Sequence, residues 1–164
     1  MVSRARLTVF ALLLVPVIVI AAAVLIYDST PIASSPNAHF SSFSVAGKTF
    51  KFTSVATTQA ELSKGLMGAK VTDTTFELFV FPDSGIYSFW MSGVNSSLDI
   101  MWLNTPQGSD SGTFVYLAPN SSPCDLGALC PNINPTARAD YVIEAQAGFA
   151  AENGIRVGTP VTLH

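Results

Sequence analysis

Aromatic side chains and a single carboxylate are concentrated in residues Phe79–Asn104. This stretch holds Trp90, Trp102 and three of the eleven phenylalanines, together with Asp99, which apolar residues flank. A carboxylate in such surroundings must be hydrogen-bonded, paired or protonated, because an unpaired buried charge costs several kcal/mol. Asp99 is therefore either an acid in a cleft, with a raised pKa, or a structural group that accepts hydrogen bonds from backbone amides of the Ser92–Ser97 loop. We favour the structural role.

Glu144 presents the same choice, since Val142 and Ile143 precede it in a predicted strand. If Glu144 faced Asp99, the two would form the carboxyl pair that glycoside hydrolases use, in which the separation of the groups sets the stereochemical outcome. The sequence does not place these two residues relative to each other. A hydrolase that acts on envelope carbohydrate therefore stays an alternative hypothesis.

Trp90 is the side chain best suited to hold a ligand. It alternates with Phe89 along a predicted strand, so one of the two is expected in the core and the other open to solvent. An exposed tryptophan beside carboxylates and a Ser/Asn-rich loop is a common way to stack a sugar or hold a peptide. Met67 and Met91 can widen an apolar pocket there, although plain packing is their ordinary role. With Asp99 and Glu144, these are the candidate binding residues.

Other chemistries lack the residues they need. The two histidines, His39 and His164, lie before the predicted domain and at the last position, which leaves no Ser-His-Asp triad and too few nitrogen and sulfur ligands for zinc. Asp110 is the only acid between Asp99 and Asp125, which is too sparse for a calcium loop. We therefore predict no metal and no cofactor.

The N-terminal segment predicts a membrane anchor. Leu7–Ile26 is an uncharged apolar run of about 20 residues, enough for a helix to cross a bilayer core. Arg4 and Arg6 precede the run and Asp28 follows it, which places the N-terminus in the cytoplasm and the rest of the chain outside. The alternative is a secretory signal cleaved near Ala21–Ala23, but the apolar run is long for a signal peptide.

The chain thus divides into three parts. Residues 1–27 form a cytoplasmic stub and a transmembrane signal-anchor helix, residues 28–40 a Ser/Pro-rich linker, and residues 41–164 an extracytoplasmic domain. The last two parts hold six basic residues against eleven acidic ones, a net charge of −5, which disfavours nucleic acid and anionic lipid as partners. The expected partners are the membrane, through Leu7–Ile26, and an envelope glycan or a membrane protein.

The two cysteines fit an external location. Cys124 and Cys130 are an even count in an oxidising compartment, which predicts a disulfide that closes a short loop. Asn95-Ser96-Ser97 and Asn120-Ser121-Ser122 match the N-glycosylation sequon, a short pattern whose use depends on the organism.

Two local patterns predict the first elements of the domain. Apolar residues alternate on either side of Ala46-Gly47-Lys48, which indicates a hairpin. Thr58-Gln59-Ala60-Glu61 fits a capping box at the start of a short helix that ends at Gly65.

The remaining predicted elements are mostly short strands. A second short helix is expected at Gly148–Asn153, and the strand at Thr113–Leu117 is expected to stop at Pro119. The fold class is α+β, mainly antiparallel β, with a compact barrel-like sheet and two short helices after the membrane helix. The further predicted strands are Glu77–Phe81, Ile86–Met91, Leu98–Leu103, Tyr141–Ala145 and Val161–Leu163.

A series of motifs resembles a known family. The series begins with Thr58-x-x-Glu61-x-x-x-Gly65-Leu66-Met67 and continues with Phe79-Val80-Phe81-Pro82, Phe89-Trp90-Met91 and Leu98-Asp99-Ile100. It ends with Tyr141-Val142-Ile143-Glu144-x-x-x-Gly148 and Gly154-Ile155-x-Val157-Gly158. In this order and spacing, from about Phe43 to Leu163, the chain resembles the uncharacterised domain of unknown function 192 family of bacteria and archaea. The resemblance implies a compact, mainly β domain and supplies no established reaction.

The chain departs from that family at one loop. Members usually continue the Phe-Trp-Met motif with Lys-Asn-Thr, whereas this chain has Ser92, Gly93 and Val94. Any activity that the lysine carries in relatives is therefore expected to be lost here.

Together these features predict a membrane-anchored extracytoplasmic binding or accessory module, without catalysis, whose groove lies near Trp90 and Asp99. The alternatives are the carboxylate-pair hydrolase and a single-span accessory subunit of a larger membrane complex.

Overall fold

The computed structural model describes residues 39–107 and 109–164. The predicted anchor, Leu7–Ile26, and nearly all of the predicted linker lie outside these residues. In the part of the chain that is described, no helix is both long and apolar enough to cross a membrane.

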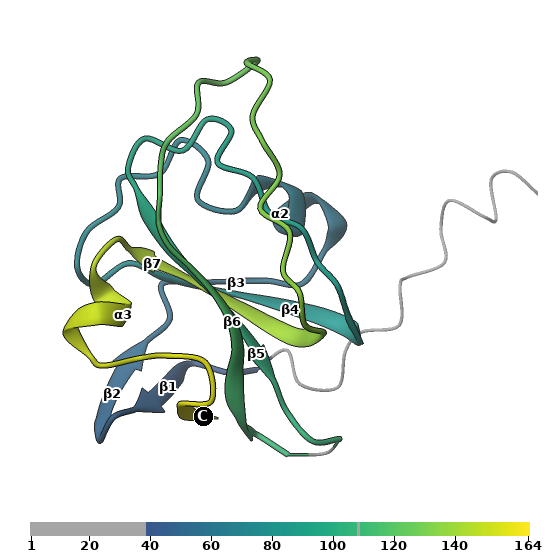
Figure 1. The fold of residues 1–164 in the computed structure, drawn as a ribbon, viewed down its shortest axis with the longest axis vertical. Helices are drawn as coiled ribbons and strands as arrows, with labels where there is room; N and C mark the ends of the chain where they lie inside the picture. The colour runs from purple at the N-terminus through teal and green to yellow at the C-terminus, as the bar shows by residue number, and fades with distance from the viewer. Residues whose placement is uncertain (1–38, 108) are drawn as a thin grey trace, which may run out of the picture. The chain divides into compact units, whose positions relative to one another are not determined.

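Eight strands form one sheet, and two short helices accompany it (Figure 1). The order of strands across the sheet is β2-β1-β8-β6-β5-β7-β4-β3, and β2 and β3 at its two ends do not pair, so the sheet is not closed into a barrel. The domain is thus mainly β with two short helices, as predicted. In chain order the elements are β1 (Ser42–Val45), β2 (Lys48–Lys51), β3 (Ser54–Ala56), α2 (Gln59–Lys64), β4 (Phe76–Gly85), β5 (Leu98–Asn104), β6 (Ser111–Ser121), β7 (Ala139–Gln146), α3 (Phe149–Glu152) and β8 (Pro160–Leu163).

The sheet is mixed rather than purely antiparallel. β3 and β4 pair in parallel, and all other neighbouring strands pair antiparallel. Parallel strands need a long crossover, and the chain between β3 and β4 supplies one that contains α2. This crossover brings α2 next to β4.

The predicted hairpin and capped helix are confirmed. β1 and β2 are joined by Ala46 and Gly47, whose φ angles of 51° and 76° are both positive, as a two-residue hairpin turn requires. The capping box around Thr58 and Glu61 starts α2, and Gly65 caps its end.

The predicted strand Ile86–Met91 is wrong. This segment makes a single bridge, between Phe89 and Ile133, because β4 already has β7 and β3 on its two sides. Residues 82–85, between the predicted strands Glu77–Phe81 and Ile86–Met91, belong to β4, and β6 continues past Pro119. The β5–β6 register shifts next to Pro119. The strand therefore tolerates a proline there, although proline has no N–H to donate to the neighbouring strand.

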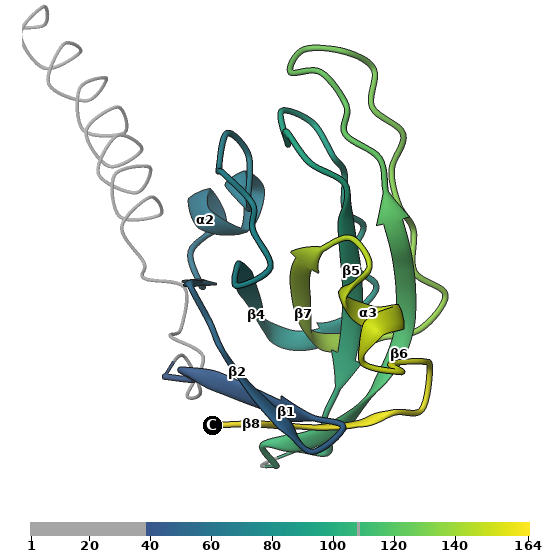
Figure 2. The ribbon, with the colours of Figure 1, turned by 90° about the vertical axis from the view of Figure 1, so that its left-hand side faces the viewer.

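The apolar side chains form a cluster on each face of the sheet. β5 is buried on both faces, as its nearly continuous apolar run predicts: Met101 and Leu103 join one cluster, and Ile100 and Trp102 join the other. The first cluster includes Phe149 of α3 and the second is covered by Leu62 of α2. We call these the α3 face and the α2 face; the two helices lie on opposite sides of the central strands in Figure 2.

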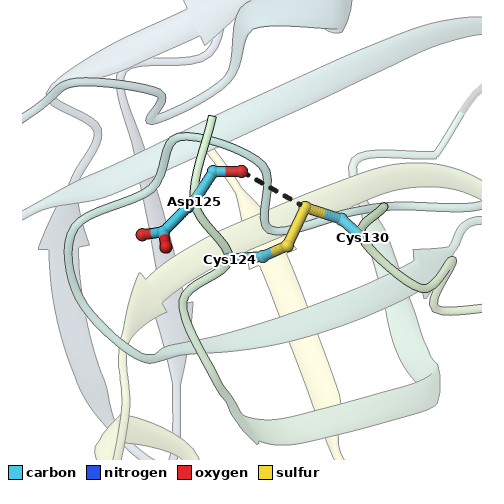
Figure 3. Close-up of a disulfide and its surroundings, with 3 residues drawn as sticks. All are labelled: Cys124, Asp125 and Cys130. Atoms are coloured by element: carbon cyan, nitrogen blue, oxygen red, sulfur yellow. Dashed lines mark hydrogen bonds between the residues drawn. A yellow bond between two sulfur atoms is a disulfide. The ribbon is translucent and has the colours of Figure 1, made fainter. Parts of the chain in front are cut away.

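A disulfide joins Cys124 and Cys130, as predicted (Figure 3). It closes a loop whose backbone carbonyl oxygen at Asp125 lies 3.8 Å from Sγ of Cys130. In Figure 1 this loop lies at the same end of the molecule as α2. The sequon residues Asn95 and Asn120 are both exposed.

Asp99 is a structural carboxylate on the α3 face. It is 1% exposed, and it accepts hydrogen bonds from three backbone amides: Asn120 at 2.8 Å, Gly148 at 3.1 Å and Ala150 at 2.8 Å. The expectation that it holds the Ser92–Ser97 loop is wrong, because the strand directs its side chain toward β6 and the start of α3. Asp99 thereby ties the β7–α3 corner and the end of β6 to the central strand.

We expect Asp99→Ala to lower the free energy of unfolding by about 3 kcal/mol or more, because three N–H donors lose a charged acceptor. Asp99→Asn should cost less, since it keeps one oxygen. Urea unfolding measures both changes, and the exposed Asp73→Asn serves as the control, with an expected change within about 0.5 kcal/mol. A loss under 1 kcal/mol for Asp99→Ala would argue against this role.

Candidate functional site

A groove of about 550 Å³ runs along α2 and the irregular segment that follows β4. None of the residues that line it carries a charge. Its apolar wall comes from Leu62, Phe81, Pro82, Ile86, Tyr87, Phe89 and Trp90, and its polar groups from Gln59, Ser63, Ser88 and Asn132.

Trp90 stands at the rim of this groove. Its side chain is 50% exposed, while Phe89 turns inward, with its ring centroid 4.8 Å from that of Phe79 and 5.3 Å from that of Trp102. The expectation that one of the two aromatic residues is open and the other is in the core is therefore confirmed, although the segment is not a strand.

The aromatic wall is held in place by specific contacts. The rings of Phe81 and Tyr87 stack with centroids 3.6 Å apart and an angle of 8° between their planes. The backbone carbonyl of Tyr87 accepts a hydrogen bond of 2.9 Å from Nε1 of Trp102, which is fully buried. The groove is thus formed before any ligand arrives.

A small chamber of about 20 Å³ adjoins the groove, with Glu144 in its lining. Leu62, Ser63, Phe89 and Trp90 line both spaces, so the chamber lies directly beside the groove. The sequence-predicted residues Trp90 and Glu144 are therefore brought together at one site.

Glu144 is a buried carboxyl group with an incomplete set of partners. It is 3% exposed, the backbone N–H of Leu66 donates to it, and its Oε2 has no hydrogen-bond partner. Burial, followed by the nearby charge of Glu77, raises the pKa of Glu144 to about 8. The group therefore holds its proton at neutral pH.

Glu77 is a second buried carboxyl group, which the sequence analysis did not single out. It lies directly opposite Glu144 in the β4–β7 register, is 6% exposed, and also has an Oε2 without a partner. Burial raises its pKa to about 6, against the lowering effects of a hydrogen bond with Ser54 and the charge of Lys64. It lines a separate pocket of about 370 Å³, to which the end of α2 also contributes.

The end of α2 passes closely over Glu144. Gly65 has φ +48°, and a Cβ there would come within 3.0 Å of the Phe79 ring and 3.4 Å of Glu144 Oε2. Only glycine allows both the backbone angle and this approach, which carries the Leu66 amide to the carboxyl group. Glu61 fixes the other end of α2: it accepts the N–H groups of Thr57 and Thr58, both at 2.9 Å, which lowers its pKa to about 2.

Asp99 and Glu144 do not form a pair. Asp99 is the register partner of Ala145, whereas Glu144 is the partner of Ile100, so the two carboxyl groups point to opposite faces of the sheet. With the sheet between them, they cannot flank one glycosidic bond.

The two candidate methionines lie on either side of the site rather than in the groove. Met67 lines the Glu77 pocket, and Met91 is packed in the core of the α2 face at 4% exposure. Among the residues described, no group of three or more His, Cys, Asp and Glu side chains could hold a metal ion.

The loop that departs from the family pattern borders the site. Ser92 lines the chamber together with Glu144. Gly93 has φ +68°, and a Cβ there would lie 2.8 Å from Cγ of Met67. Its backbone bonds to Gly68 and Cys124 instead, which joins this loop to the α2 end and to the disulfide loop.

We expect the free energy of unfolding to fall as the pH rises from 5 to 8. The pKa of Glu144 is about 8 in the folded chain and lies near its ordinary value of 4.5 in the unfolded chain. The bound proton therefore stabilises the folded state at low pH, and this stabilisation is lost as the pH rises through about 8. Glu144→Gln should flatten the slope by about 2–4 kcal/mol over this range.

Urea unfolding at pH 5, 6, 7 and 8 tests this expectation. Glu61 does not contribute to the slope, because its lowered pKa affects stability only in more acidic solution. The exposed Glu152→Gln is the control, and equal slopes for the wild type and Glu144→Gln would contradict the assignment.

Comparison with known proteins supports the family resemblance and gives no activity. No curated protein matches this chain. A protein of unknown function from Novosphingobium aromaticivorans DSM 12444 has a similar structure, with a TM-score of 0.62 and 25% identity over 81% of this chain and 93% of that one. A protein from Sinorhizobium meliloti 1021, provisionally described as a transcription regulator, has a TM-score of 0.61 and 22% identity over 74% of this chain and 90% of that one, a likeness of fold alone.

The family model described as "Uncharacterized ACR" matches residues 42–163, which covers every strand and both helices. The chain belongs to this family, the domain of unknown function 192.

Proposed function

We propose that the domain is an extracytoplasmic binding module that holds a stretch of envelope glycan in the groove along Trp90. The observation that carries the proposal is the half-exposed Trp90 beside a preformed aromatic wall. Trp102, the other tryptophan, is fully buried. A large aromatic ring kept at the rim of a groove offers a flat apolar face to a ligand.

The chemistry of the groove matches an uncharged part of a glycan. Aromatic rings pack against the apolar faces of sugar rings, while hydroxyl and amide side chains hydrogen-bond to sugar hydroxyls. Gln59, Ser63 and Asn132 supply such groups here, and no charged residue lines the groove. The volume of about 550 Å³ is within the range of small-molecule sites, which suits a short stretch of glycan.

The proposal does not include catalysis. The Asp99–Glu144 pair that a glycoside hydrolase would use is not assembled, since Asp99 holds backbone amides on the α3 face and Glu144 lies on the α2 face.

We propose further that Leu7–Ile26 anchors the domain outside the cell. The Cys124–Cys130 disulfide supports this location, because such bonds persist in oxidising compartments. We expect the full chain to stay with the membrane after alkaline carbonate extraction, and its cysteines to resist alkylation until they are reduced. Release into the wash, or labelling without reductant, would argue for another location.

Trp90→Ala should weaken oligosaccharide binding about tenfold or more, because the stacking surface at the rim is lost. Tryptophan fluorescence measures binding to the wild type with a panel of trisaccharides: maltotriose, cellotriose, chitotriose and triacetylchitotriose. Trp102 is buried and hydrogen-bonded, so a change on ligand addition reports on Trp90 and should vanish in Trp90→Phe.

Val157→Ala is the matched control, since Val157 is also apolar and exposed but does not line the groove. Calorimetry extends the comparison to Trp90→Ala itself. Equal binding by Trp90→Ala and wild type, or no binding of any trisaccharide by the wild type, would overturn the proposal.

A further inference from the structure

We infer that the disulfide between Cys124 and Cys130 fixes Trp90 in the groove, so that reduction of this bond weakens ligand binding while the sheet stays folded. The inference rests on the proposed function and adds a redox control to the same site.

The half-exposed tryptophan of the groove is positioned by backbone hydrogen bonds that lie outside the sheet. Directly before it, Phe89 and Ile133 exchange two bonds, of 3.0 and 2.7 Å. Directly after it, Met91 accepts a bond of 3.1 Å from the N–H of Cys124, whose carbonyl oxygen accepts one of 2.8 Å from Gly93. The tryptophan is thus held between two arms of one loop, a first arm at Cys124 and a second arm at Ile133.

The disulfide ties these two arms to each other (Figure 3). Cys124 belongs to the first arm and makes two of the four bonds itself. Cys130 leads into the second arm, in which Ile133 makes the other two. The covalent bond therefore sets the spacing between the two groups of hydrogen bonds on either side of Trp90.

The second arm also carries part of the groove. Asn132 lines the groove together with Trp90. Ser88, another lining residue, donates a hydrogen bond of 2.7 Å from its hydroxyl to Oδ1 of Asn134. A shift of this arm therefore moves a polar group of the groove as well as the segment that bears the tryptophan.

The tip of the loop, residues 125–129, does not supply a second clamp. All of its residues are exposed, and the backbone hydrogen bonds that they make in the described chain stay inside the loop. The side chain of Leu126 lies against Gly93, which belongs to the Trp90 segment and not to the sheet. Opening the disulfide would give both arms a freedom that the short closed loop denies them. A ligand would then have to order its own site, which costs affinity.

The sheet has its own supports. Cys124 and Ile133 are only partly buried where they pack against the α2-face cluster. The end of β6 is held separately, because the N–H of Asn120 donates to Asp99, and β7 pairs along both sides with β4 and β5. Reduction should therefore release the arms and leave the core in place.

A dithiol such as dithiothreitol can carry out the reduction, since both cysteines are partly exposed. One of its thiolates attacks a cysteine sulfur, which breaks the bond between the cysteines and forms a mixed disulfide. Its second thiolate then displaces that cysteine. The reductant leaves as a cyclic disulfide, and both cysteine thiolates take up protons.

The test compares the oxidised and the reduced full chain in detergent, by calorimetry with the four trisaccharides of the panel. Reduction should weaken binding about tenfold, because the site is no longer ordered in advance. Amide hydrogen exchange gives a readout that needs no ligand. Exchange at Phe89, Gly93 and Ile133 should become about tenfold faster or more, while the amides of β5 and β7 stay protected.

Two variants control the comparison. The double variant Cys124→Ser, Cys130→Ser should bind as weakly as the reduced wild type and should not respond to dithiothreitol. If this variant fails to fold, reduction of the folded wild type still decides the question. Leu129→Ser changes a fully exposed side chain of the same loop, keeps the disulfide and should bind like the oxidised wild type.

The outcomes separate this inference from the proposed function. Equal trisaccharide affinity in the two redox states would overturn the redox control and leave the glycan groove in place. Faster exchange throughout β5 and β7 would also overturn it, because the bond would then support the whole domain. If no trisaccharide binds in either state while exchange quickens only in the arms and the Trp90 segment, the clamp on Trp90 stands and the glycan is overturned.

Discussion

The register between β4 and β7 determines the character of the α2 face. It sets Glu77 directly opposite Glu144, so two carboxyl groups are buried side by side where the other side chains are apolar. Like charges in these positions repel, and burial disfavours the charged form of each. Burial and the nearby Glu77 accordingly raise the pKa of Glu144. The end of α2 then supplies one amide to Glu144, and a glycine at position 65 makes that approach possible.

Asp99 shows how differently a carboxylate behaves on the other face. Three backbone amides donate to it, so both of its oxygen atoms have hydrogen-bond partners within the domain. Glu144 receives only the amide of Leu66 among the described residues, and one oxygen is left over. The two residues lie one register step apart on neighbouring strands, yet one is part of the framework and the other borders a cavity.

Local patterns in the sequence were enough to predict the hairpin at Ala46-Gly47, the capping box of α2 and the doubly buried strand β5. Each of these depends on residues close together in the chain. The pairing of Glu77 with Glu144 depends on two strands far apart in sequence, and a shift of one residue would have sent one carboxyl group to the other face. Period-two alternation with Phe79 is a signal that could have placed Glu77 on the α2 face, but only the register gives its partner. The segment Ile86–Met91 was mistaken for a strand because its apolar residues serve the groove and the core instead of a sheet.

The unpaired oxygen of Glu144 is difficult to explain by stability alone. A buried, incompletely bonded carboxyl group is often replaceable by an apolar side chain of similar size without loss of stability. Its position is notable, because Glu144 lines a chamber that shares Trp90 with the groove. Ser92, in the loop where the chain departs from its family's usual pattern, also lines this chamber and brings no charge of its own. The charged group that the chain itself brings to this chamber is Lys64, at the end of α2, which lines the same space as Glu144.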